Sequence, residues 1–415
     1  MKKATTCLAL AAAAFSGVAA NPKLPESCSW KGGNSVVCRF DGFSKEYVPV
    51  IAAVELAQIP KITDLLFQIN IANGKGQTPI TDEQLITVGQ SLNSTSLTSL
   101  ALIVGSLRKV TGDGISKFTA LNPIAQNSLT SLSLDVQSNP VSDANAATIG
   151  ENLAKFSSLK TASVNVKNMM ACPDHRCHPT MTGNGLAAIV GGLKDLSKVQ
   201  TLSLIAATAP FASFDSAKAI GDGLANMKAL KSLHLEIPNS GLTDKDYMGV
   251  FQGVATLSNL EQLYLNVQGN KLSGSSLLST TRGINAFKKL ASLTTDFGEY
   301  NGAETGNNTI SISGVQSAVK VLNQANYQGQ WALSLENSLA STDIKAYAEA
   351  LACLKNPKIL KGSVPLSLTS VSEPRFSKDT EVSAKLGECS TGLALDTDVT
   401  GGPFNDHTHV CVTCQ

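Results

Sequence analysis

The feature that most constrains the fold is a leucine pattern that recurs at intervals of about 30 residues. The pattern L-x-x-L-x-L-x-(I/V) begins at Leu230 and begins again at Leu260. Between the two copies, apolar residues recur at steps of three and four, as on one face of a helix. These residues are Tyr247, Val250, Phe251, Val254 and Leu257. The repeating unit is therefore predicted to be a short strand that buries alternate side chains, followed by a helix.

The same register extends through most of the chain. Its first positions are Ile62, Leu97, Leu129, Leu159, Val199, Leu230, Leu260 and Leu290. Successive first positions lie 35, 32, 30, 40, 31, 30 and 30 residues apart, lengths that accommodate a full helix in most units. Two degraded copies follow, one around Leu333 and Leu335 and one around Val364, Leu366 and Leu368.

This pattern resembles the leucine-rich-repeat family, in particular its long-repeat class, typified by ribonuclease inhibitor and by many protist proteins. The resemblance covers roughly residues 60–370. It implies an α/β solenoid shaped like a horseshoe, with a parallel sheet on the concave side and helices on the convex side. One departure concerns the buried asparagine ladder of the family. Asn139, Asn239 and Asn270 follow the strands in turn-like sequences, so we expect them to shape turns rather than a continuous ladder.

The ends of the chain differ from the repeats. Residues 1–20 combine Lys2 and Lys3, a short apolar run and small residues before Asn21, which is typical of a secretory signal peptide. Residues 21–45 are predicted to be an N-terminal disulfide cap, 46–370 the solenoid, and 371–415 a C-terminal cysteine-containing cap. We therefore expect a secreted, extracellular protein without a transmembrane segment.

Cysteine use agrees with secretion. Cys7 leaves with the signal peptide, and the even number that remains is predicted to form disulfides in an oxidising compartment. The remaining cysteines are Cys28, Cys38, Cys172, Cys177, Cys353, Cys389, Cys411 and Cys414. Proximity favours the pairs Cys28–Cys38 and Cys172–Cys177, with the last four pairing among themselves.

Two insertions interrupt the period, at Lys167–Gly183 and Phe297–Gly314. Insertions in solenoids form loops beside one face and often carry function. Asn93 and Asn307 occupy N-x-S/T sequons and are predicted to be glycosylated if the source organism attaches N-linked glycans.

Charge and motifs exclude several function classes. Without the signal peptide the chain has 31 basic and 32 acidic residues, a net charge of −1, and no basic face for nucleic acid. No G-x-S-x-G, H-E-x-x-H or P-loop motif is present. Two Cys/His clusters, Cys172–His178 and His407–Cys414, have spacings that suit zinc, but disulfides are the favoured reading. We expect no enzyme activity, no metal and no cofactor.

The predicted register places two columns of side chains on the concave sheet, at the fifth and seventh positions of each unit. The fifth-position column reads Leu66, Ala101, Ser133, Ser163, Ser203, His234, Tyr264 and Thr294. The seventh-position column reads Gln68, Ile103, Asp135, Asn165, Ile205, Glu236, Asn266 and Asp296. From these columns the predicted binding residues are Asp135, Asn165, His234, Glu236, Tyr264, Asn266 and Asp296. Exposed strand positions are also simply polar in many sheets, so a structural explanation stays open.

These observations favour a non-enzymatic recognition module. Its concave sheet is expected to bind an extracellular protein, peptide or glycan, and the acidic column favours a basic partner. The oligomeric state stays open. Two alternatives remain: an extracellular structural or wall-associated protein without a single ligand, and a metal-dependent hydrolase that uses the Cys/His loops.

Overall fold

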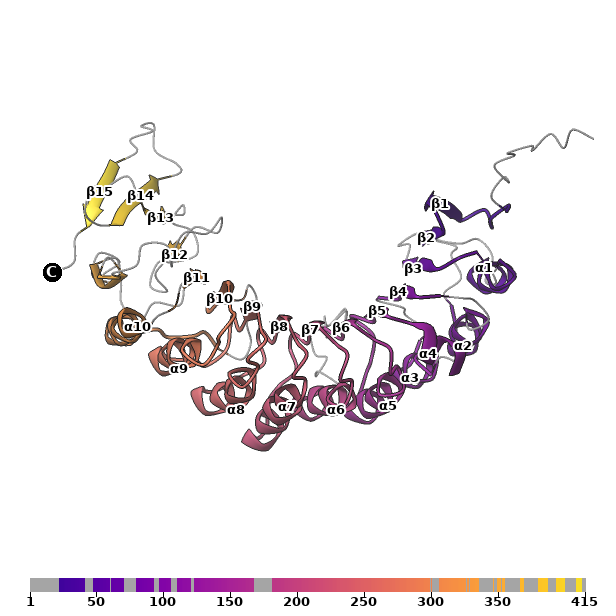
Figure 1. Cartoon of the computed structure of the whole chain (residues 1–415), viewed down its shortest axis with the longest axis horizontal. Coiled ribbons are helices and arrows are strands. Elements are labelled where there is room, and N and C mark those ends of the chain that lie inside the picture. Colours follow the sequence, from indigo (N-terminus) through magenta and orange to yellow (C-terminus); the bar gives the residue numbers. More distant parts are fainter. Residues whose placement is uncertain are drawn as a thin grey trace, which may run out of the picture.

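A computed structural model shows a curved solenoid with a sheet on its concave side and helices on its convex side (Figure 1). The structure describes residues 22–41, 48–59, 61–70, 80–92, 97–105, 110–120, 123–167, 181–298, 300, 306–325, 327, 329–335, 346, 349–351 and 353–354, together with the backbone of four strands between 366 and 412. The predicted α/β leucine-rich-repeat horseshoe is thus confirmed.

One sheet of 11 strands lines the concave side in chain order. Its strands are β1 (Cys28–Gly32), β2 (Ser35–Asp41), β3 (Asp64–Asn70), β4 (Ser99–Ile103), β5 (Ser131–Asp135), β6 (Thr161–Asn165), β7 (Thr201–Ile205), β8 (Ser232–Glu236), β9 (Gln262–Asn266), β10 (Ser292–Asp296) and β11 (Gln330–Ser334). All neighbours from β2 to β11 pair in parallel, whereas β1 pairs antiparallel with β2. Parallel pairing follows because a helix returns the chain to the same edge after every strand.

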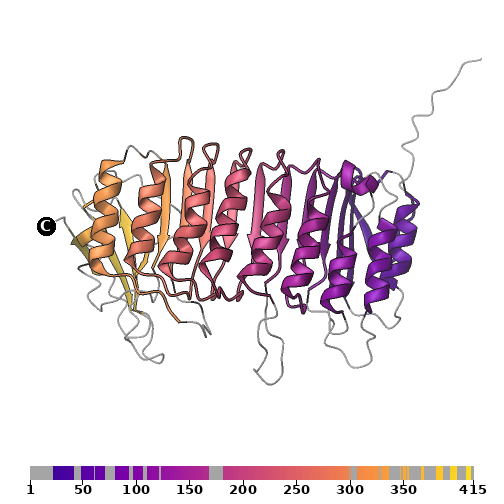
Figure 2. The same cartoon turned by 90° about the horizontal axis from the view of Figure 1, so that it is seen from below.

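The helices stack side by side on the convex side (Figure 2). They are α1 (Val48–Ala57), α2 (Asp82–Ser91), α3 (Gly112–Phe118), α4 (Pro123–Ser128), α5 (Asp143–Leu153), α6 (Gly183–Leu193), α7 (Phe214–Asn226), α8 (Asp244–Val254), α9 (Gly274–Ile284) and α10 (Ile312–Gln324). Most begin after a Ser or Thr whose side chain accepts a backbone N–H of the first turn, as for Thr81, Ser142 and Thr243. None of the helices in the described ranges is both long and apolar enough to cross a membrane.

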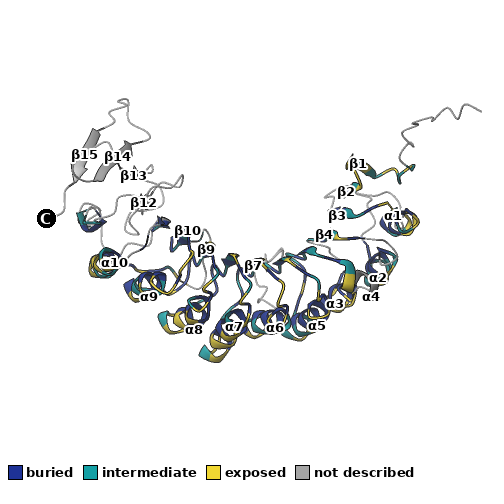
Figure 3. Ribbon diagram, in the orientation of Figure 1, coloured by how far each residue is buried: buried dark blue, intermediate teal, exposed yellow. Residues whose placement is uncertain are grey.

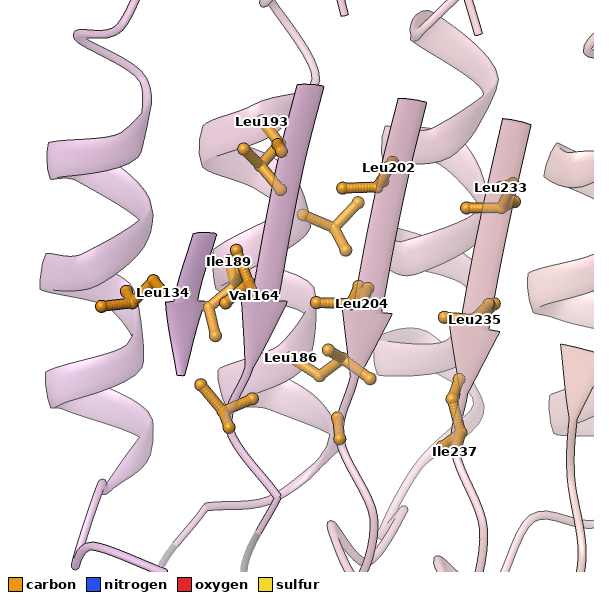
Figure 4. Close-up of a cluster of buried hydrophobic side chains, with 14 of the residues drawn as sticks. Leu134, Val164, Leu186, Ile189, Leu193, Leu202, Leu204, Leu233, Leu235 and Ile237 are labelled. Atoms are coloured by element: carbon orange, nitrogen blue, oxygen red, sulfur yellow. The ribbon is translucent and has the colours of Figure 1, made fainter. Parts of the chain in front are cut away.

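The core lies between the two layers and is made by the repeated apolar positions (Figure 3). Figure 4 shows how one part of it is filled: Leu202 and Leu204 of β7 and Leu233 and Leu235 of β8 project from the sheet. Leu186 and its neighbours on α6 meet this layer. Each repeat therefore buries its leucines only against adjacent repeats, which allows a long chain to share one continuous core.

Buried asparagines bridge successive repeats, contrary to the expectation for Asn139 and Asn270. The Nδ2 of Asn270 donates to Ile237 O and Val267 O, both at 2.9 Å, and its Oδ1 accepts from the N–H groups of Ser240 and Leu242 at 3.0 Å. Asn139 and Asn308 bond preceding carbonyl groups in the same way. Asn139 and Asn270 thus do more than shape turns, because their amides supply donors and acceptors that the buried strand-to-helix turn lacks. The ladder is not continuous, since Ala209 occupies this position in one repeat.

Asn239, by contrast, has the predicted turn role. It has a left-handed backbone with φ of 50°, and the equivalent positions Ser138, Thr208 and Gly269 have φ of 58°, 60° and 60°. Each of these four residues immediately precedes the ladder position of its repeat, which is occupied by Asn139, Ala209, Ser240 and Asn270. The turn therefore uses a left-handed residue and then a buried residue. Asn239 and Asn270 have different roles because they occupy the first and the second of these two positions.

A second set of contacts connects helix starts. Asp143, the first residue of α5, accepts from the backbone N–H and the hydroxyl of Thr182 at 2.7 Å each. Asp82 makes the same double contact with Thr111, and Asp244 makes it with Ser273. An acidic residue is also favoured at a helix N-terminus because of the helix dipole. Each aspartate therefore stabilises its own helix and connects it to the next one.

The predicted N-terminal cap is a hairpin of β1 and β2, and it extends the same sheet. Cys28 and Cys38 face each other across the hairpin and form the predicted disulfide. Cys353 is disulfide-bonded as well. Cys172, Cys177, Cys389 and Cys414 lie outside the described residues, and for Cys411 only the backbone is described.

The prediction of a last repeat strand around Leu366 was wrong. Leu366–Leu368 forms β12, which pairs antiparallel with β13 (Thr380–Leu386). With β14 (Leu393–Val399) and β15 (Thr408–Val412) they make a separate four-stranded antiparallel sheet. Alternating apolar residues occur in any strand, so leucine spacing alone does not show which sheet a strand joins.

The ladder yields a stability prediction. Replacing Asn270 by Ala leaves Ile237 O, Val267 O and the N–H groups of Ser240 and Leu242 without these partners. We expect the free energy of unfolding to fall by about 3 kcal/mol, as for several buried unsatisfied groups. Chemical denaturation measures this. The control is Asn226→Ala on the exposed end of α7, which should change stability by about 0.5 kcal/mol or less. Equal effects of the two substitutions would contradict the structural role of the ladder.

Candidate binding surface on the concave sheet

The two predicted columns lie where the register placed them. Ser203, His234, Tyr264 and Thr294 are direct partners on β7 to β10 in the fifth-position column. In the seventh-position column, Ile205, Glu236, Asn266 and Asp296 are partners in the same way. Their side chains are half-buried and alternate with fully buried leucines along each strand. The surface geometry predicted from the leucines is therefore confirmed.

A third column on the same face was missed from the sequence. The first residue of each strand has the same parity as the other two columns and also faces the concave side. This column reads Ser99, Ser131, Thr161, Thr201, Ser232, Gln262 and Ser292. The sequence does predict this column. The residue immediately before the first core leucine of each strand has the same alternation as the other two columns. The concave floor is thus rich in hydroxyl groups over β5 to β7.

Four of the predicted binding residues have a local structural role. Asp135, Asn165 and Asn266 each accept, through Oδ1, the backbone N–H two residues later at 3.1 Å. Asp296 accepts the N–H of Gly298 at 2.9 Å. This is the usual turn-forming bond of Asp and Asn, and it satisfies a backbone donor at the end of each strand. Their presence in the column is therefore explained without a ligand.

His234, Glu236 and Tyr264 have no such explanation. The rings of His234 and Tyr264 stack with their centroids 4.2 Å apart and an angle of 13° between their planes. His234 Nε2 lies 2.5 Å from Glu236 Oε1, and the two side chains are 38% and 23% exposed. These three side chains form the aromatic patch, which stands on a floor of serine and threonine near the middle of the horseshoe (Figure 1).

The concave face around the aromatic patch carries acidic side chains. Burial raises the pKa of the Asp296 carboxyl group, and the nearby charge of Glu236 raises it further, while hydrogen bonds from Gly298, Ser334 and Gln268 oppose the shift. Burial also raises the pKa of Tyr264, with contributions from Glu236 and Asp296. The concave positions of β4 to β11 carry Asp135, Glu236 and Asp296 but no Lys or Arg. A cation is therefore the charge that this face lacks.

The two insertions meet at the edge of this surface. Lys167, just after β6, places its Nζ 5.8 Å from the centre of the Tyr300 ring, just after β10. Strands β7, β8 and β9 lie between them in the sheet. This contact places one cationic side chain at the edge of the sheet where the strands end. The sequence indicated that both insertions belong to one edge of the sheet but gave no sign that they approach each other.

No metal site is found among the side chains that the structure describes, since no three His, Cys, Asp or Glu residues are close enough to bind one ion. The Cys172–His178 loop lies outside the described residues, and the side chains of His407–Cys414 do as well. The same holds for the predicted glycosylation site Asn93. The side chain of Asn307 is half-buried beside the ladder residue Asn308, so glycosylation at either sequon stays a prediction.

Comparisons with known proteins give fold-level likeness only. No family model and no curated protein sequence matches this chain. An internalin from Listeria monocytogenes superposes with a TM-score of 0.37 at 17% identity, covering 74% of this chain and 68% of that chain. The yeast complex of Rad7 and Elc1 contains a chain with a TM-score of 0.38 at 16% identity, covering 78% and 74%. At these scores, neither structure assigns a function to this protein.

The raised pKa of Asp296 predicts a pH dependence of stability. The folded chain binds this proton more tightly than the unfolded chain, so the ionised carboxylate destabilises the fold, increasingly as pH rises through the folded pKa. Asp296→Asn keeps an acceptor for Gly298, so we expect a higher melting temperature at pH 7 and a difference that shrinks toward pH 4.

Thermal unfolding at several pH values measures this. Asp135→Asn is the matched control, because it keeps the equivalent bond to Gln137 and lies three strands away from Glu236. We expect it to change the melting temperature less at pH 7. A lower melting temperature of Asp296→Asn at pH 7 would contradict the destabilising role of this carboxylate.

Proposed function

We propose that this protein is a secreted, non-enzymatic recognition module that binds a basic segment of another protein or a peptide on its concave sheet. The observation that carries the proposal is the aromatic patch of His234, Glu236 and Tyr264, the bulkiest group on a floor of small hydroxyl side chains. Aromatic side chains give large contact areas at low entropic cost, and they dominate the binding energy of many interfaces.

The position of the patch on adjacent parallel strands supports binding. His234 and Tyr264 stand between buried leucines of β8 and β9, and the strands themselves are fixed by the core. Side chains on such a scaffold are already ordered before a partner arrives, so little conformational entropy is lost on association.

The negative charge of the concave face favours a positively charged partner. Asp135, Glu236 and Asp296 face the same concavity, and strands β4 to β11 contain no Lys or Arg. Complementary charge speeds association and disfavours acidic partners. A basic protein segment fits this surface better than a neutral one.

Secretion is supported by the signal-like segment at 1–20 and by oxidised cysteines. Disulfides such as the Cys28–Cys38 bridge and that of Cys353 form and persist mainly in oxidising compartments. A partner is therefore expected outside the cytosol.

Selection from a displayed random-peptide library tests the proposal. Peptides that bind the wild-type protein should be rich in Lys and Arg, and their affinity should fall as salt rises. The double substitution Glu236→Lys with Asp296→Lys should weaken them at least about tenfold. The control is Glu55→Lys with Glu151→Lys on exposed positions of α1 and α5, which gives the same net charge. Equal affinity for both double variants would contradict a concave site.

A further inference from the structure

Tyr264 has two faces with different surroundings. One face stacks on His234 of the preceding strand. The neighbour on the other side is Thr294 of β10, which pairs directly with Tyr264. Because the ring is nearly parallel to that of His234, its second face is directed toward the space above Thr294. A threonine side chain is shorter than an aromatic ring, so it does not match the full height of the Tyr264 ring. The place beside this second face of Tyr264, above Thr294 and one strand spacing of about 4.8 Å across, is called the slot.

One carboxylate, that of Asp296, lies beside the slot, and a second, that of Glu236, lies on the far side of Tyr264. Asp296 follows Thr294 by two residues on the same strand and faces the same side. Glu236 lies on the other side of Tyr264, where it contacts His234. Within the described residues, no Lys or Arg forms an ion pair with Asp296. Burial and the Glu236 charge both disfavour the ionised form of this carboxylate, whereas a cation beside it would favour that form and so oppose both effects.

We propose that this slot, between Tyr264 and the surface above Thr294, binds the guanidinium group of an arginine in the partner segment. The inference rests on the proposed function and names the chemical group that the concave site recognises. The guanidinium plane stacks on the second face of Tyr264, and its N–H groups donate to the Asp296 carboxylate. His234 holds Tyr264 upright from the opposite face, and Glu236 holds His234, so both act as positioning residues.

Arginine fits the slot better than lysine for two reasons. A guanidinium group is planar and stacks on a ring, whereas an ammonium group is a compact and strongly hydrated point charge. A guanidinium also presents parallel N–H donors that match both oxygens of a carboxylate. A neutral group of the same shape would stack but would not offset the charge of Asp296.

Peptide titration followed by NMR tests this on the full chain. The probes are three capped pentapeptides, Gly-Gly-X-Gly-Gly, in which X is arginine, lysine or citrulline. The observed signal is the ring Cε1–H of His234 in protein labelled with ¹³C at histidine. The chain has five histidines, and the signal that disappears in His234→Gln is that of His234. The arginine peptide should shift this signal in a saturable way, the lysine peptide should bind about tenfold more weakly, and citrulline should give no saturable shift.

Three variants locate the binding. Thr294→Phe fills the slot and Tyr264→Leu removes the ring, and each should weaken the arginine peptide about tenfold or more. Ser163→Phe adds the same bulk in the same column on β6, away from Tyr264, and should leave the affinity unchanged. Asp296→Asn leaves the slot open and keeps an acceptor for the N–H of Gly298. A loss of affinity for the arginine peptide in this variant therefore reports the missing charge rather than misfolding.

The outcomes separate the two proposals. An arginine peptide that binds Thr294→Phe as well as wild type, or a citrulline peptide that binds as well as arginine, would overturn the arginine slot. If library peptides still depend on Glu236 and Asp296 while Thr294→Phe leaves them unaffected, the concave recognition function stands and the slot does not. Peptides that bind regardless of the concave substitutions would overturn both proposals.

Discussion

The fold depends on satisfying backbone groups at the turn where each strand leaves the sheet. These turns are buried between neighbouring repeats, so water does not reach their N–H and C=O groups. The amides of Asn139, Asn270 and Asn308 supply the missing donors and acceptors and bond to the preceding repeat. Where an asparagine fixes the turn in this way, the next strand starts in register with the last one. The concave columns, and any site built from them, follow from that register.

Much of the fold was readable from the sequence because leucine burial is a strong and periodic signal. The spacing from Leu230 to Leu260 is enough to align His234 with Tyr264 on neighbouring strands. Leucine spacing does not predict the structure where something other than burial decides which strand pairs with which. Leu366 alternates with its neighbours as a repeat strand would, yet its backbone pairs with β13 in another sheet. The two roles of Asn239 and Asn270 also depend on backbone dihedrals and on carbonyl groups from another repeat, which the residue type does not reveal.

The sequence predicts the candidate site as columns of polar side chains. The structure shows that some of these side chains have a structural role in turns and that others do not. Asp135, Asn165 and Asn266 bond the backbone two residues on, so a polar residue at these positions needs no partner protein to explain it. The stacking of His234 on Tyr264 and its contact with Glu236 depend on rotamers and could not be predicted from alternation alone. The same is true of Lys167 and Tyr300, which are 133 positions apart in the sequence and meet across three strands.

The aspartates at the helix starts also affect where the solenoid tolerates a cut. The double contact joins α2 to α3, α5 to α6 and α8 to α9. Removing the second helix of one of these pairs would leave an aspartate at a helix start without its hydroxyl partner. A shortened version of this protein should therefore end after a complete pair rather than inside one.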